Sequence, residues 1–190
     1  MFTPLFALAA LQASAATPPS APQAAPVAQA RPLTALPGLR TTYYDVSGNT
    51  IAEINASIKA ARAKEGGNAQ TVKNDWAVAP KVTRSTTAGK CTVTSVTNSF
   101  SALVELPRLA NEEAVSEAVR NSWKTFVGKL EADAAARLWF VHDRSDSVAA
   151  AMRGQSCDGA KAAGVAALAK LKAEAAAWQP PAPPAAAVTQ

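Results

Sequence analysis

Two ionisable residues stand four positions apart in a stretch that otherwise has the pattern of an amphipathic helix. The stretch runs from Asn111 to Val141, and Asp133 and Arg137 fall inside its apolar stripe when successive residues are turned by about 100°. The rest of the stripe is made of Val115, Val119, Trp123, Phe126, Leu130 and Val141. A carboxylate and a guanidinium at this spacing share one helix face, so we predict a partly buried ion pair between them.

His142 and Asp143 form the second pair of residues that could take part in catalysis. A histidine and a carboxylate near serines suggest a Ser/His/Asp hydrolase, but no Gly-x-Ser-x-Gly elbow is present, and adjacent helical residues point about 100° apart. We therefore expect His142 to be a surface or helix-end histidine. The two cysteines, Cys91 and Cys157, form no Cys-x-x-Cys pair. In an oxidising compartment they would pair with each other and close a long loop.

Segments rich in β-branched and aromatic residues are predicted to be the strands that position these groups. We expect strands at Arg40–Val46, Ala69–Val78 and Cys91–Leu106, and 81–86 is a candidate for another. The segment Cys91–Leu106 is either one long strand or a hairpin. Pro80 and Pro107 are expected to end strands, and Ala88-Gly89-Lys90 is expected to form a turn.

Capping and periodicity predict the helices. Thr50-Ile51-Ala52-Glu53 has the form of a capping box and predicts a helix that ends near Lys64. The central helix is expected to start at Asn111, as a side-chain cap followed by two acids, and it can extend past His142 to Arg153. A last Ala-rich helix is predicted over 158–178. The order is a βαβ unit, further antiparallel strands and two C-terminal helices, which predicts an α+β fold.

Composition places one folded domain between two tails. The chain has 190 residues and a net charge of +5 but no run of Lys or Arg, so we expect a solvated basic surface and no nucleic-acid partner. The short apolar core and the small-x-small pattern near the start predict an exported protein, periplasmic or secreted, with no transmembrane segment in the mature chain. The expected parts are a signal peptide (1–16), a disordered Ala/Pro-rich tether (17–38), the domain (39–178) and a disordered Pro/Ala tail (179–190).

Several short motifs occur in an order that resembles a known family. They are Tyr43–Ile54, Thr71…Trp76, Cys91 at the start of a Val/Thr-rich strand, Leu106-Pro107-Arg108, Trp123-x-x-Phe126, and Cys157 before a final helix. Over roughly 41–178 the chain resembles the bacterial domain-of-unknown-function family nine hundred and twenty-two, described as predicted secreted zinc-dependent proteases. The resemblance implies a signal peptide, a Cys91–Cys157 disulfide and an α+β fold similar to a minimal zincin.

The functional motif of that family is H-E-x-x-H, which follows Trp-x-x-Phe by one or two helical turns. Two histidines at this spacing bind Zn²⁺ from one helix face, and the glutamate takes a proton from the metal-bound water. Carried over onto this chain, the three positions are Asp133, Ala134 and Arg137. Arginine cannot ligate a metal and alanine cannot act as a base. We therefore expect no catalytic residue, no metal ligand and no cofactor at these positions.

These observations predict an exported, non-catalytic homologue of a secreted zinc-dependent protease family. We expect a periplasmic binding or interaction module whose partner is a peptide or an envelope protein. In that case a groove that binds a ligand without cutting it would persist near Asp133 and Arg137. Two alternatives are an active zinc metallopeptidase with atypical ligands and a purely structural envelope protein.

Overall fold

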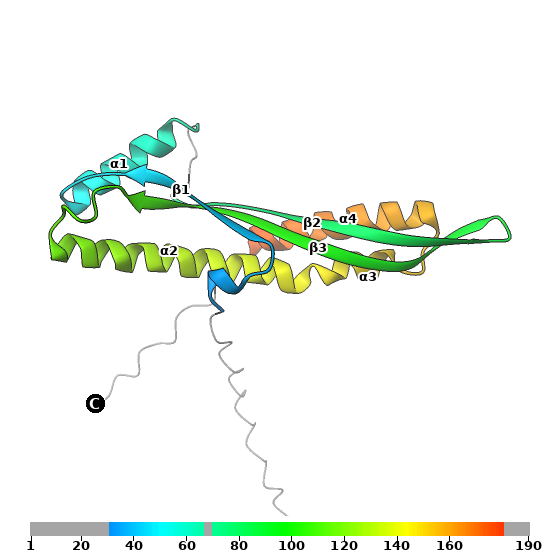
Figure 1. The fold of residues 1–190 in the computed structure, drawn as a ribbon. Helices are drawn as coiled ribbons and strands as arrows, with labels where there is room; N and C mark the ends of the chain where they lie inside the picture. The colour runs from blue at the N-terminus through cyan, green and yellow to red at the C-terminus, as the bar shows by residue number, and fades with distance from the viewer. Residues whose placement is uncertain (1–30, 67–69, 181–190) are drawn as a thin grey trace, which may run out of the picture.

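The computed structural model describes residues 31–66 and 70–180. Its elements follow in the order η1 (Leu33–Ala35, a 3-10 turn), β1 (Leu39–Val46), α1 (Ile51–Ala63), β2 (Lys73–Thr87), β3 (Lys90–Leu109), α2 (Glu117–Arg144), α3 (Asp146–Met152) and α4 (Cys157–Ala177). The strands form one sheet, and α1 and α2 lie on opposite faces of it (Figure 1). The predicted mixed α+β class, with helices at the C-terminal end, is confirmed.

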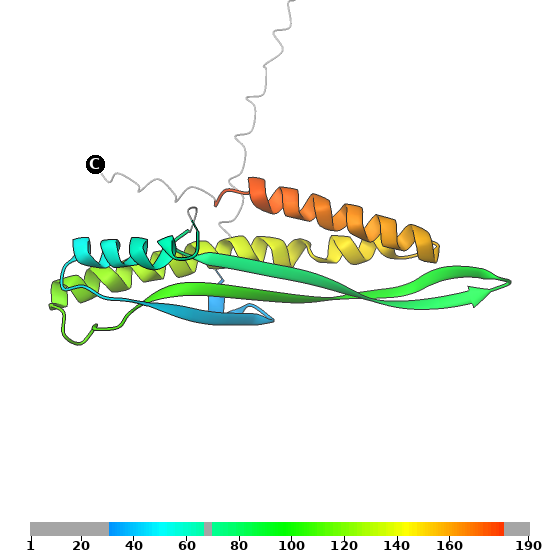
Figure 2. The same cartoon turned by 90° about the horizontal axis from the view of Figure 1, so that it is seen from above.

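The sheet has the strand order β1-β3-β2, with β3 in the centre. β1 is parallel to β3, whereas β2 and β3 form a long antiparallel hairpin. The predicted order of strand, helix and strand is present at the start, but β1 and β2 are not neighbours because β3 lies between them. Figure 2 shows the hairpin extending beyond the N-terminal end of α4.

Two prolines do not end strands as we expected. Pro80 lies inside β2 and is paired with Asn98; β2 is an edge strand, where the missing N–H of proline is tolerated. Pro107 lies inside β3, opposite Tyr44 of β1. The pairing of β2 with β3 starts at Glu105, so the end of β3 has a neighbour on one side only and tolerates a proline. Consequently 81–86 is a continuation of β2.

The predicted turn and the predicted first helix are confirmed. Ala88 and Gly89 both have positive φ, of 50° and 76°, the geometry of a two-residue turn that matches the twist of a hairpin. At the start of α1, the Thr50 hydroxyl accepts a hydrogen bond from the Glu53 N–H at 3.2 Å, and the Glu53 carboxylate accepts one from the Asn49 N–H at 2.6 Å. This part of the chain follows local capping chemistry.

The central helix begins later than expected. Ser116 caps α2 by accepting from the Val119 N–H. The Asn111 side chain instead exchanges hydrogen bonds with the Gly48 backbone, at 3.4 Å and 3.2 Å. The helical chain does continue beyond His142, with a break at Ser145, and Gly154 follows α3 with a φ of +73°.

The buried face of α2 differs from the predicted stripe. Ala134 and Leu138 are buried at 2 % and 0 % exposure, whereas Asp133 is exposed. At 100° per residue Ala134 and Leu138 lie about 80° and 120° from Phe126, and Asp133 lies at about −20°. In the second half of the helix, the buried face therefore contains small alanines and is rotated away from the face that the large side chains predict. These alanines pack against the inward-facing residues Ala102, Val104 and Leu106 of β3.

A disulfide between Cys91 and Cys157 is present, as predicted, with the two Cα atoms 5.6 Å apart. It joins β3 near the hairpin turn to the first residue of α4. Backbone hydrogen bonds from Val93 N–H to Gln155 O at 2.9 Å and from Gly154 N–H to Val93 O at 3.0 Å support the same junction. The hairpin is thereby fixed to the α3–α4 connection.

The packed part of the chain extends before the expected boundary at Leu39. Leu33 and Leu36 are buried, at 8 % and 4 % exposure, in a cluster with α2 and β3. The predicted signal peptide (1–16), most of the predicted tether and most of the predicted tail (179–190) lie outside the described residues. Within the part of the chain that the structure describes, no helix is both long enough and apolar enough to cross a membrane.

Candidate functional site

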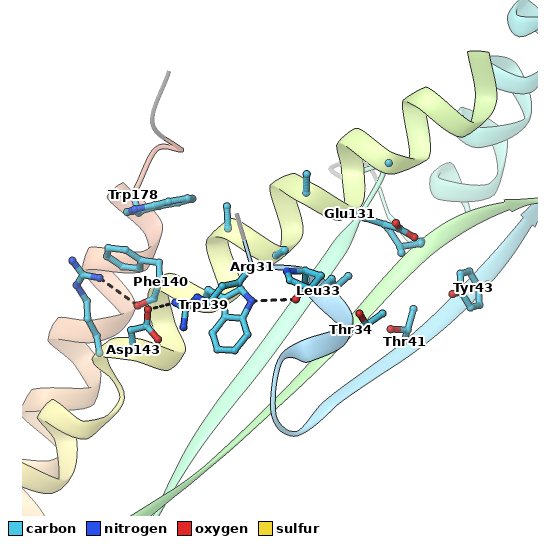
Figure 3. A pocket seen from close by; sticks show the side chains of 17 residues that line it. Arg31, Leu33, Thr34, Thr41, Tyr43, Glu131, Trp139, Phe140, Asp143 and Trp178 are labelled. Carbon is cyan, nitrogen blue, oxygen red and sulfur yellow. Dashed lines mark hydrogen bonds and ion pairs between the residues drawn. The ribbon is translucent and has the colours of Figure 1, made fainter. Parts of the chain in front are cut away.

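A groove of about 680 Å³ runs along the flank of α2 that faces β1 (Figure 3). Its two ends are marked by Tyr43 of β1 and by Trp178, the residue that follows α4. The residues between them come from the segment before β1, from β1, from β3 and from α2. They are Arg31, Pro32, Leu33, Thr34, Thr41, Leu106, Gly128, Glu131, Ala132, Ala135, Ala136, Trp139, Phe140, Asp143 and Arg144. Four separate parts of the chain therefore build this groove: 31–43, β3, α2 and Trp178.

Small residues of α2 leave the space that forms the floor. Gly128, Ala132 and Ala136 are spaced by four positions and therefore share one side of the helix. A Cβ atom added at Gly128 would meet no heavy atom within 4 Å. Side chains this small cannot fill the space between α2 and β1, and the groove remains open.

The segment before β1 is held on α2 by an aromatic and charged contact. The Arg31 guanidinium lies 3.8 Å from the centroid of the Trp139 ring and pairs with the Asp143 carboxylate. The Trp139 indole N–H donates to the Pro32 carbonyl at 3.3 Å. Together with buried Leu33, these contacts make one wall of the groove, and Trp139 is its central aromatic residue.

Aromatic rings also close the end of the groove near α4. The rings of Phe140 and Trp178 are 5.3 Å apart, tilted by 38°. The Arg144 guanidinium lies 3.8 Å over the Phe140 ring. Because Trp178 is the C-cap of α4 and Phe140 belongs to α2, this contact fixes the point at which the chain leaves its last helix.

The charges of the groove are largely compensated. Partial burial would raise the pKa of Asp143, but hydrogen bonds from Arg31 and His142 outweigh it, so the pKa lies below the ordinary value. The carboxylate form of Asp143 is therefore the one the fold favours, paired with Arg31. The remaining charged residues, Glu131 and Arg144, line an otherwise apolar and aromatic surface. Such a surface suits an extended, mostly apolar ligand.

The comparisons with known proteins identify a family but no characterised relative. The family model for "Bacterial protein of unknown function (DUF922)" matches residues 41–180. The chain belongs to this family. No curated protein matches it, and no solved structure matches it. The DUF922 match covers both cysteines and α2, whereas the wall formed by Arg31 to Thr34 lies before it.

The three positions at which the sequence resemblance placed an H-E-x-x-H motif do not line the groove. Asp133 is exposed on the surface of α2, Ala134 is buried in the core and Arg137 is half-buried. Although both residues lie in the described chain, Asp133 and Arg137 form no ion pair, so the predicted partly buried pair is wrong. The Arg137 guanidinium instead lies 5.9 Å from the centroid of the Trp178 ring. The groove is on the neighbouring side of the same helix, where Glu131, Ala135 and Trp139 project.

The donor set at the motif positions does not fit zinc. Across residues 31–66 and 70–180, no three His, Cys, Asp or Glu side chains come together as a metal site would require. His142 lies in the last turn of α2, as expected of a helix-end histidine. Its ring stands edge-on to Phe100 and Trp139, at 5.3 Å and 5.1 Å, and its Nδ1 lies 3.3 Å from Asp143. It supports the residue that pairs with Arg31.

The sequence did contain one buried ion pair that we missed, on the other face of the sheet. Arg62 of α1 donates to Glu105 of β3 at 2.6 Å, and its side chain is only 4 % exposed. It also donates to the Thr71 carbonyl at 3.1 Å and stacks 3.8 Å from the Tyr44 ring. The sequence indicates that Arg62 is buried, because it follows Ile58 by four positions on the apolar side of α1.

Proposed function

We propose that this DUF922 protein is an exported, non-catalytic homologue of a secreted zinc-dependent protease family. It acts as a periplasmic or secreted binding module, and its groove along α2 takes an extended segment of a peptide or of an envelope protein. The observation that carries the proposal is the groove itself, which combines a floor of small residues with the rings of Trp139, Phe140, Trp178 and Tyr43. Aromatic residues around a shallow apolar groove are a common means of peptide recognition.

The absence of catalysis is supported by the chemistry of the motif positions. Asp133 and Arg137 would have to supply the two metal ligands, and a guanidinium cannot do so. Ala134 has no group that could move a proton, and its side chain is buried. His142, the single histidine of the sequence, is not among the residues that line the groove, and Asp143, which does line it, is paired with Arg31.

Export is supported by two independent features. Residues 1–16 have the pattern of a signal peptide. The Cys91–Cys157 disulfide would persist in an oxidising compartment such as the periplasm and would be reduced in most cytosols.

The direct test is selection of random 12-residue peptides on the purified full chain, followed by affinity measurements on the enriched peptides. Ala132→Gln places a longer side chain on the exposed groove floor, and Ala118→Gln makes the same change on an exposed part of α2 outside the groove. We expect binding that Ala132→Gln weakens at least 10-fold and Ala118→Gln leaves unchanged. No enrichment, or equal binding by both variants, would contradict the proposal.

A parallel measurement separates binding from catalysis. The chain is incubated with zinc and desalted, and its metal content and its cleavage of the enriched peptides are measured. We expect no stoichiometric zinc and intact peptides. Stoichiometric zinc together with cleavage would instead favour a metallopeptidase with atypical ligands.

A further inference from the structure

The chain that follows α4 starts beside the groove. Trp178 leaves the helix with φ −68° and ψ 134°, close to polyproline II geometry. Gln179 precedes Pro180, and a residue before proline also favours an extended conformation. The contact between Trp178 and Phe140 fixes this exit at one end of the groove. The described chain therefore ends, at Pro180, two residues beyond one end of the groove.

The composition of the residues after Pro180 matches the groove. Residues 181–190 read PAPPAAAVTQ and contain no charged side chain. Prolines and alanines in an extended chain have small, apolar side chains, and proline rings pack well on aromatic rings. The groove offers such rings beside a floor of glycine and alanine.

The length also matches. From Phe140 back to Gly128, the stretch of α2 along the groove rises by about 18 Å at 1.5 Å per residue. A polyproline II segment rises by about 3.1 Å per residue, so about six residues cover that distance. The segment 181–186 is sufficient, and 187–190 is not needed for contact.

We infer that residues 181–186 of the same chain occupy the α2 groove in polyproline II form, so that an external peptide must displace them. The inference rests on the proposed function, because it assigns an occupant to the same groove. A tethered segment has an effective concentration on the order of 1 mM. If its intrinsic Kd is about 100 µM, the tail lowers the apparent affinity for an external peptide by about 10-fold.

The test uses full-length chains with altered tails. Pro183→Asp with Pro184→Asp places two charges in the segment that must contact the groove. Ala187→Asp with Val188→Asp adds the same charges beyond it and is the matched control. The first readout is the indole N–H signal of Trp139 by NMR, which is distant in sequence from both pairs of substitutions. We expect the first variant to shift this signal and the control to leave it unchanged, with the signal of buried Trp123 constant in both.

The second readout is binding of the synthetic peptide PAPPAAAVTQ. We expect the first tail variant to bind it about 10-fold more tightly than the wild-type chain does, and Ala132→Gln in that variant to abolish binding. Equal affinity in both chains, together with an unchanged Trp139 signal, would overturn the inference. A wild-type chain that dimerises with increasing concentration, while the first tail variant stays monomeric, would also overturn it in favour of exchange between two copies.

Peptides enriched from the random selection distinguish the two proposals. If the first tail variant binds those peptides but not PAPPAAAVTQ, the inference fails and the proposed function stands. If the first tail variant binds neither the enriched peptides nor PAPPAAAVTQ, both the inference and the proposed function fail.

Discussion

Arg62 and Glu105 join α1 to the central strand of the sheet through a hydrogen bond of 2.6 Å between Nη1 and Oε2. Burial alone would lower the pKa of Arg62, but its interactions with Glu105 and Tyr44 outweigh burial and raise it. For Tyr44, burial raises the pKa, and this effect exceeds the opposing effect of Arg62. The guanidinium thus holds together a carboxylate, a phenol ring and the Thr71 carbonyl beneath α1.

Breaking this pair should be costly. Arg62→Ala removes the cation and leaves Glu105, 24 % exposed, without its partner. We expect the free energy of unfolding in urea to fall by about 3 kcal/mol. The control is Arg108→Ala, which breaks the exposed Arg108–Asp45 pair and should cost less than about 1 kcal/mol. A double-mutant cycle of Arg62 with Glu105→Gln that shows no coupling would mean the pair does not stabilise the fold.

Removal of the disulfide should destabilise the whole domain. Cys91→Ser with Cys157→Ser opens a loop spanning a sequence separation of 66, and we expect a loss of about 2–4 kcal/mol. The melting temperature measured by calorimetry should fall. Reductant should produce a similar fall in the wild-type chain and none in the double variant. Identical melting of the wild-type chain with and without reductant would argue against the bridge.

Acid should release the segment that contains Arg31. The folded pKa of Asp143 lies below its ordinary value of 3.8, so the Arg31–Asp143 pair contributes stability that is fully present above about pH 4 and is lost as the pH falls through the lowered value. The fluorescence of Trp139, on which Arg31 stacks, should change in that acidic window. Asp143→Asn should abolish the transition, whereas Asp146→Asn, at an exposed residue that forms no ion pair with Arg31, should retain it.

Adjacent positions of α2 should respond in opposite ways to charge. Asp133 is exposed, so Asp133→Ala should change the free energy of unfolding by no more than about 0.5 kcal/mol. Ala134 is 2 % exposed, and Ala134→Asp would bury an unpaired carboxylate, at a cost of several kcal/mol. Chemical unfolding of the two variants checks both values. A large effect of Asp133→Ala, with coupling to Arg137, would restore the ion pair that the structure lacks.

Much of the fold follows from local chemistry that the sequence displays. The Thr50–Glu53 cap, the Ala88-Gly89 turn and the last helix depend on neighbouring residues, and they are where we expected them. Pro80 and Pro107 were wrongly predicted to end strands, because a proline interrupts a strand only where its missing N–H would have paired with a neighbouring strand. That neighbour is supplied by distant parts of the chain.

The candidate site was harder to predict, because its floor is formed by residues with very small side chains. We predicted the buried face of α2 from its large apolar residues, and that face included Asp133. In the structure, the small residues Ala134 and Ala135 are the buried ones. The groove lies where Gly128, Ala132 and Ala136 leave space, and it needs Arg31 and Trp178 from either end of the domain. Only the folded arrangement shows that these residues meet.

The Cys91–Cys157 bridge makes the intervening chain a closed covalent ring that contains α2 and α3. A protease that cuts one peptide bond inside this ring, for example in the connection at 110–116 before α2, leaves two fragments still joined through sulfur. Residues on both sides of such a cut would migrate as one species until a reductant is added. In a compartment rich in proteases, the two fragments that form the groove would thus stay covalently joined after the first backbone cleavage.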